Sequence, residues 1–130
     1  MPLLGLVLAV GTAGMTMGVD LSGSKWQPSF ITASEIPSGV HMNVQFGPDG
    51  RITGYGGCNR FFGGYTIDGD HIRIGPLGST RKGCPGITQL ETSFFATLEA
   101  AKSFSQDDTT LTLFDAAGGK LARFVRAEEK

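Results

Sequence analysis

Residues 54–65 read GYGGCNRFFGGY, and this stretch is the most informative part of the sequence for the architecture of the chain. Five of its twelve positions are glycine, so the backbone there adopts a positive φ or lies too close to another segment for a Cβ. A phosphate-binding loop would end in lysine and serine or threonine and open a helix, whereas residues 60–62 are bulky and typical of strands. We therefore expect a strand, a kink or bulge at the glycines, and a second strand that carries Tyr65 and Ile67.

Two β-hairpins are predicted around this stretch. Residues 40–46 alternate apolar and polar side chains, which is the period of a half-buried strand. The turn sequence GPDG at 47–50 then leads back into a partner strand at 51–55. The same pattern recurs with a strand at 64–67, a turn at 68–70 and a strand at 71–74.

An amphipathic helix is predicted from residue 88, where the apolar period changes to three or four. Its apolar face consists of Ile87, Leu90, Phe94, Leu98 and Ala101. Thr88 and Glu91 fit a capping box, in which each side chain would accept from a free amide at the helix start. Strands are expected again at 103–105, 111–114 and 120–126.

The order of these elements indicates an α+β, β-rich fold. We expect a curled antiparallel sheet or partly open barrel of roughly seven or eight short strands, with the one amphipathic helix packed on it. The chain length suits a single core, which we assign to residues 21–126. Residues 127–130 are expected to form a solvated tail.

Residues 1–20 have a different composition from the rest. Residues 3–10 are apolar and no charge precedes Asp20, as in the apolar region of a signal peptide, although the basic region in front of it is missing. Glycine and threonine interrupt the stretch, so no transmembrane span is expected, and no cysteine follows for a lipid anchor. The alternative is a disordered or strand-forming tail.

The charge and composition exclude some classes of function. The chain has 11 basic and 12 acidic residues, scattered along it, which is not the electrostatic footprint of a nucleic-acid-binding protein. Its 20 glycines accompany the apolar content of a globular protein, so they indicate turns rather than disorder.

Cys58 and Cys84 are open to four interpretations: a disulfide, a metal pair, a catalytic thiol, or two buried thiols. A zinc site would need two more ligands, and His41 and His71 lie on separate predicted strands. A nucleophilic thiol would need a base, and none is near in sequence. If the chain is exported, the oxidising compartment favours a disulfide that ties the glycine-rich hairpin to the segment before the helix.

The carboxylates indicate no catalytic or metal site. Asp68 and Asp70 flank Gly69 as in a calcium loop, but the other ligands of such a loop are absent and Asp-Gly is typical of a hairpin turn. No serine, histidine and aspartate arrangement has a supporting motif. We expect no catalytic residues and no cofactor.

The chain resembles the META domain, the HslJ-like family of bacterial heat-shock proteins, over residues 21–125. The resemblance rests on Trp26, Gly57, Cys58, Asn59, Arg60, Phe61, Gly63, Gly64, Tyr65, residues 74–77 (IGPL), Ser79, Thr80, Arg81, Cys84, Glu91, Phe94 and Phe95. It implies a compact β-rich domain with a helix packed on it, found in envelope or secreted proteins and linked to stress response. It implies no established enzymatic activity.

The family motif is expected to have a structural role. Asn59 suits a tight turn or a positive φ, Phe61 and Tyr65 supply aromatic surface to the core, and Arg60 can reach carbonyls or a carboxylate. The motif residues so interpreted are Trp26, Gly57, Asn59, Arg60, Phe61, Gly63, Tyr65, Thr80 and Arg81.

The leading functional hypothesis is a non-enzymatic, monomeric module of the periplasm or of the secreted proteins. It would act in stress response by binding another protein or an envelope component. One alternative is a carrier that encloses a small hydrophobic ligand between helix and sheet. The other is a thiol-based redox protein that uses Cys58 and Cys84.

Overall fold

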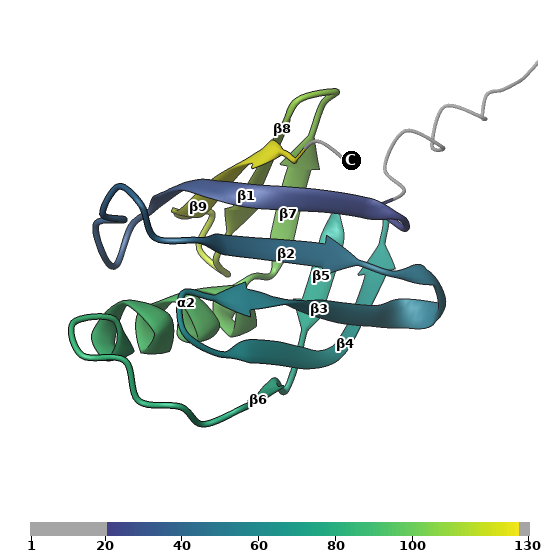
Figure 1. Ribbon diagram of the computed structural model, residues 1–130. Coiled ribbons are helices and arrows are strands. Elements are labelled where there is room, and N and C mark those ends of the chain that lie inside the picture. Colours follow the sequence, from purple (N-terminus) through teal and green to yellow (C-terminus); the bar gives the residue numbers. More distant parts are fainter. Residues whose placement is uncertain (1–20, 128–130) are drawn as a thin grey trace, which may run out of the picture.

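The protein is an antiparallel β-barrel with an α-helix at its lower side in the view of Figure 1. The structure is a computed structural model, and it describes residues 21–127. The strands are β1 (Ser24–Ile31), β2 (Met42–Phe46), β3 (Arg51–Gly56), β4 (Arg60–Asp68), β5 (His71–Ile74), β6 (Gly78–Ser79), β7 (Ser103–Gln106), β8 (Thr110–Phe114) and β9 (Lys120–Arg126). The helices are the 3-10 turn η3 (Pro48–Gly50) and α2 (Thr88–Ala100). The signal-peptide-like segment and most of the expected tail lie outside the described residues.

The strands follow one another around the barrel in the order β3, β2, β1, β9, β8, β7, β5 and β4. An additional pairing between β3 and β4 closes the ring, with Gly54 opposite Phe61. The short β6 is added to β4 through Phe61 and Phe62. The β-rich fold expected from the sequence is confirmed, and the sheet is closed.

Both predicted hairpins are present. In the first, β2 pairs with β3 and the chain turns through η3, so that Phe46 lies opposite Ile52. In the second, β4 pairs with β5 and Asp68 lies opposite His71. Gly69 makes that turn at φ 64°, a conformation that favours glycine.

Trp26 lies in β1, a strand that the sequence pattern did not single out. The side chain of Trp26 is fully buried, and its indole nitrogen donates to the hydroxyl of Ser24 at 2.7 Å. The Arg126 guanidinium lies 4.4 Å from the centre of the Trp26 ring, where a cation–π contact is favourable. Trp26, a motif residue to which the sequence assigned a structural role, therefore attaches the first strand of the barrel to the core.

Helix α2 begins at Thr88 as expected, and it buries Leu90, Phe94 and Leu98 in the core. The predicted capping box is wrong. Ile87 occupies the N-cap, no side chain caps the helix, and the carboxyl group of Glu91 accepts hydrogen bonds from the turn before β4 instead. Amides at an exposed helix end can bond to water, whereas those of a buried turn need a protein acceptor.

Aromatic rings fill the space between the helix and the sheet. The rings of Phe61 and Phe94 meet edge to face at 6.0 Å, and the Phe94 ring lies 6.4 Å from that of Phe124. All three side chains are at most 1% exposed. The interior volume that an enclosed hydrophobic ligand would require is therefore occupied by the protein's own side chains.

Candidate functional site

The glycine-rich stretch makes a tight turn between β3 and β4. Gly57 has φ 109°, and the amide of Gly56 donates to the carbonyl of Asn59 at 2.9 Å. A Cβ on Gly54 would lie 2.5 Å from the Phe61 ring, and one on Gly63 would lie 2.8 Å from the Pro76 carbonyl oxygen. The glycines thus provide both the positive φ and the close approaches expected from the sequence.

Glu91 reaches from α2 to the backbone of this turn. Its Oε2 accepts from the amides of Cys58 at 3.0 Å and Asn59 at 2.6 Å. Its Oε1 accepts from the Asn59 carboxamide at 2.8 Å, and the Glu91 side chain is only 6% exposed. One carboxyl group therefore serves three donors and attaches the helix to the turn.

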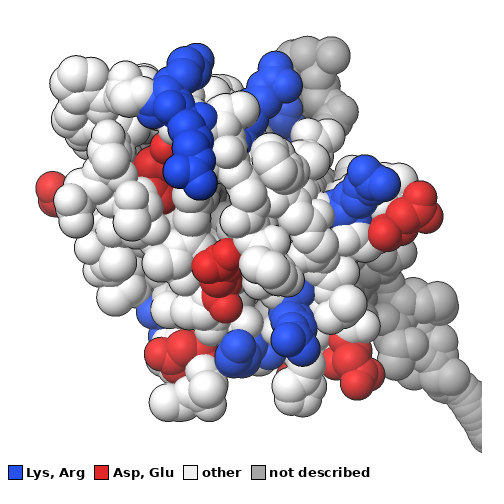
Figure 2. All heavy atoms as spheres, turned by 90° about the horizontal axis from the view of Figure 1, so that it is seen from below, with Lys and Arg blue, Asp and Glu red and all other residues white. Residues whose placement is uncertain are grey.

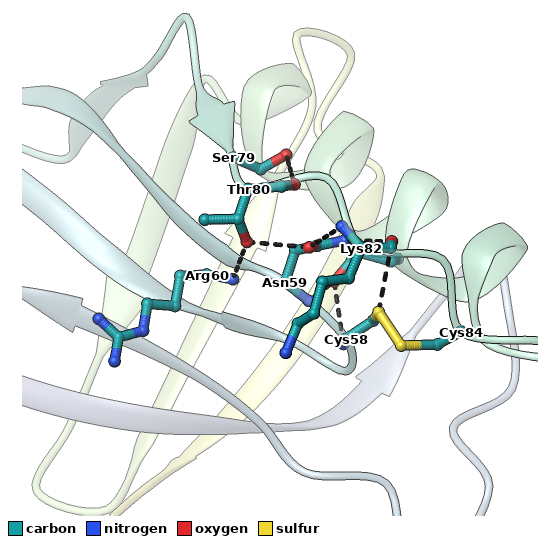
Figure 3. The surroundings of a disulfide bond; sticks show 8 residues. Cys58, Asn59, Arg60, Ser79, Thr80, Lys82 and Cys84 are labelled. Carbon is teal, nitrogen blue, oxygen red and sulfur yellow. Dashed lines mark hydrogen bonds between the residues drawn. A yellow bond between two sulfur atoms is a disulfide. The ribbon is translucent and has the colours of Figure 1, made fainter.

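Asn59 extends this network to the segment that follows β6 (Figure 3). Its Oδ1 accepts from the Thr80 hydroxyl at 2.8 Å and from the Lys82 amide at 2.7 Å, while its Nδ2 also donates to the Lys82 carbonyl at 3.1 Å. The Thr80 hydroxyl in turn accepts from the amide of Arg60 at 3.2 Å. The Asn59 carboxamide thus pairs with a backbone segment much as a strand would.

A disulfide between Cys58 and Cys84 lies beside this network (Figure 3). The two Cα atoms are 6.0 Å apart and 26 positions apart in sequence, and Cys58 is only 2% exposed. The bond ties the turn before β4 to the segment that leads into α2. We call the set Cys58, Asn59, Thr80, Lys82, Cys84 and Glu91 the junction.

The remaining motif residues have separate places. Phe61 is buried against α2, and Tyr65 packs its ring edge to face on Phe46 at 5.0 Å and donates its hydroxyl to the Gly47 carbonyl at 2.8 Å. Arg81 is exposed within the segment that Asn59 binds. The sequence assigned Arg60 to a carbonyl or a carboxylate, but only its backbone bonds to Thr80 and its guanidinium extends away from the junction (Figure 3).

An open groove of about 510 Å³ lies on the outer face of β1–β4, next to the junction. It is lined by Lys25, His41, Asn43, Gln45, Thr53, Gly54, Tyr55, Arg60, Phe61 and Phe62. We call this hollow the groove. Phe62 is 51% exposed, and the rings of His41 and Tyr55 lie 5.8 Å apart. A smaller hollow of about 260 Å³ adjoins it and shares Tyr55 and Arg60 with it.

Strand register brings the groove together. Alternate residues of a strand point outward, and the pairing places Gln45 opposite Lys25 and Thr53 opposite Phe62. No pattern in the sequence predicted the groove. The sequence pattern that could have indicated it is the polar and aromatic residues at every second position of these strands. Alternation alone, however, does not show which strands lie side by side.

The charged residues that line the groove, Lys25 and Arg60, are both cations. Elsewhere the two signs mix, as on the α2 side of the molecule in Figure 2. Within residues 21–127 no three histidine, cysteine, aspartate or glutamate side chains gather closely enough to hold a metal ion. None of the helices in that range has the length and apolar character needed to cross a bilayer.

Comparisons with known proteins agree with this architecture. The family model of the META domain matches residues 19–128. A crystal structure of a DUF4847 family protein from Bacteroides vulgatus is similar, with a TM-score of 0.63 and 15% identity over 85% of this chain and 96% of that one. An NMR structure of a protein from Burkholderia xenovorans has a TM-score of 0.70 and 21% identity over 99% of this chain and 100% of that one. No curated protein matches significantly by sequence.

Proposed function

Since the chain belongs to the META domain family, we propose that it is a non-enzymatic binding module of the cell envelope or of the secreted proteins. The module acts as a monomer in stress response and holds a protein or an envelope component in the groove. The observation that carries the proposal is the exposed aromatic and cationic lining of the groove, beside a junction whose polar groups bond to one another.

The junction has a structural role in this proposal. The side chains of Asn59 and Glu91 are at most 6% exposed, and each makes several hydrogen bonds within the protein. Buried polar groups that are fully bonded rigidify a fold and offer little to a ligand. The motif that identifies the family is then the part that holds the barrel, the helix and the segment before the helix together.

The disulfide supports an exported protein, because such bonds form and persist in oxidising compartments. The burial of Cys58, which is 2% exposed, weakens the thiol-based alternative, because a redox-active disulfide must be accessible to an attacking thiolate. The packed interior likewise weakens the carrier alternative, because Phe61, Phe94 and Phe124 occupy the space between helix and sheet. Binding at the outer surface is the function that the geometry supports best.

The proposal is tested by capture from envelope extracts of heat-stressed host cells. Immobilised wild-type protein is compared with Phe62→Ser, which alters an exposed ring of the groove, and with Phe30→Ser. Phe30 is a matched control, because it is 42% exposed and lines a different hollow. We expect Phe62→Ser alone to lose the captured component. Equal capture by all three proteins would reject the groove as the binding surface.

A further inference from the structure

We propose that the ligand of the groove is an acidic oligosaccharide, an inference that rests on the proposed binding function. Sugar rings would lie against the rings of Tyr55 and Phe62, and a carboxylate of the sugar would bind the guanidinium of Arg60. The groove volume of about 510 Å³ is within the range of ligand sites, about 300–1,000 Å³.

The backbone under the groove is already paired, which argues against a peptide bound as an added strand. Strand β2 lies between β1 and β3, and β3 lies between β2 and β4. Adding a strand requires an exposed sheet edge with free amides and carbonyls. A ligand of this face must therefore be recognised by side chains.

Those side chains suit a sugar. The faces of aromatic rings carry negative charge and attract the weakly positive C–H groups that cover the face of a pyranose. Phe62 and Tyr55 offer such rings, and Phe62 is 51% exposed. The amides of Asn43 and Gln45 and the hydroxyl of Thr53 supply donors and acceptors for sugar hydroxyls along the same face.

The charges around the groove favour an acidic sugar over a neutral one. Lys25 and Arg60 line the groove and Lys82 lines the adjoining hollow, while no aspartate or glutamate lines either one in the part of the chain that is described. The Arg60 side chain extends away from the junction (Figure 3), and Lys82 is exposed. An arginine can bind a carboxylate through two parallel hydrogen bonds, which adds geometric selectivity to charge.

The test uses three probes on the full chain with its disulfide intact. Hexagalacturonate carries both the sugar rings and the carboxylates, its methyl ester keeps the rings without the charge, and hexaglutamate places six side-chain carboxylates on a peptide. Binding is followed by calorimetry and by amide shifts in NMR spectra. We expect hexagalacturonate to shift amides of β2, β3 and β4 under the groove, and to bind about tenfold more tightly than either other probe.

Two variants locate the contacts. Arg60→Gln is expected to weaken hexagalacturonate binding about tenfold and to leave the weak binding of the methyl ester unchanged. Phe62→Ser is expected to weaken the binding of both hexagalacturonate and its methyl ester. Arg123→Gln changes an exposed arginine that does not line the groove, and it should alter neither affinity by more than about twofold. The NMR spectrum of each variant shows whether it folds.

Equal binding of hexaglutamate would overturn the proposal and identify an acidic peptide as the ligand class. Shifts outside the groove, or no binding of hexagalacturonate, would also overturn it. In either case, capture from extracts that still depends on Phe62 would leave the binding function in place. If capture from extracts did not depend on Phe62 either, both the ligand proposal and the proposed binding function would be rejected.

Discussion

The junction and the groove lie side by side, but their polar groups are used in opposite ways. In the junction the side chains of Asn59 and Glu91 are buried and bond to each other and to the backbone. In the groove the guanidinium of Arg60 extends away from the junction (Figure 3), and the ring of Phe62 is 51% exposed. Some residues of the motif therefore stabilise the fold, while their neighbours in the chain face solvent.

Strand β4 shows how this division arises. Phe61 and Phe62 are adjacent, yet the first is 1% exposed and the second 51%. Successive side chains of a strand point to opposite faces, so the Phe61 ring packs on the rings of α2 while the Phe62 ring is exposed in the groove. A sequence motif that crosses a barrel wall carries residues for both sides.

The largest expected effect contrasts these two phenylalanines. Phe61→Ala removes a ring packed against those of Phe94 and Phe95, and should lower the free energy of unfolding by about 3–5 kcal/mol. Phe62→Ala, its matched control, should change that free energy by no more than about 0.5 kcal/mol. Denaturation in urea measures both. Similar losses for the two variants would contradict the assignment of inner and outer faces.

The disulfide should be the next largest contribution. Replacing Cys58 and Cys84 together by alanine frees a loop of 26 positions, which the chain-entropy relation values at about 3.5 kcal/mol of stability. The wild-type protein, treated with a mild reductant while folded and then denatured, should show no free thiol, as expected of a structural crosslink. Two free thiols in that assay would restore the thiol-based alternative.

A smaller effect is expected from Glu91→Gln. The amide of glutamine has one acceptor oxygen where Glu91 uses two, so at least one donor of the Cys58–Asn59 turn is left buried without an acceptor. We expect a loss of about 2 kcal/mol in the free energy of unfolding. Glu99→Gln is the control on the same helix, because Glu99 is exposed and accepts from the amide of Leu77 alone. Equal losses would refute the special role of Glu91.

The smallest effect lies outside both regions, in the turn between β7 and β8. Hydrogen bonds from the amides of Thr109 and Thr110 lower the pKa of the Asp107 carboxyl in the folded protein. The stability that this turn adds is therefore present above the unfolded pKa of about 3.9, and is lost as the pH falls through the lower folded value. Asp107→Asn should remove this pH dependence from the free energy of unfolding measured in urea. A pH profile equal to that of the wild-type protein would refute the role of the Asp107 carboxyl.

The sequence predicted much of the barrel and little of the groove. Alternation at 40–46 and the turn glycines located both hairpins, and the apolar period located α2. The capping box failed because local spacing cannot show that Glu91 faces a turn 32 or 33 positions earlier in the chain. The groove was missed because it needs β1 beside β2 and β3 beside β4, and lateral pairing depends on the whole fold.

The most direct test of this division compares the unfolding free energies of Asn59→Ala and Arg60→Gln, two neighbours assigned to the junction and to the groove. Asn59→Ala removes four side-chain hydrogen bonds and leaves the buried Oε1 of Glu91 without its partner. We expect the free energy of unfolding to fall by about 3 kcal/mol or more for Asn59→Ala and by no more than about 0.5 kcal/mol for Arg60→Gln. A loss below about 1 kcal/mol for Asn59→Ala, or an equal loss for both variants, would contradict this division.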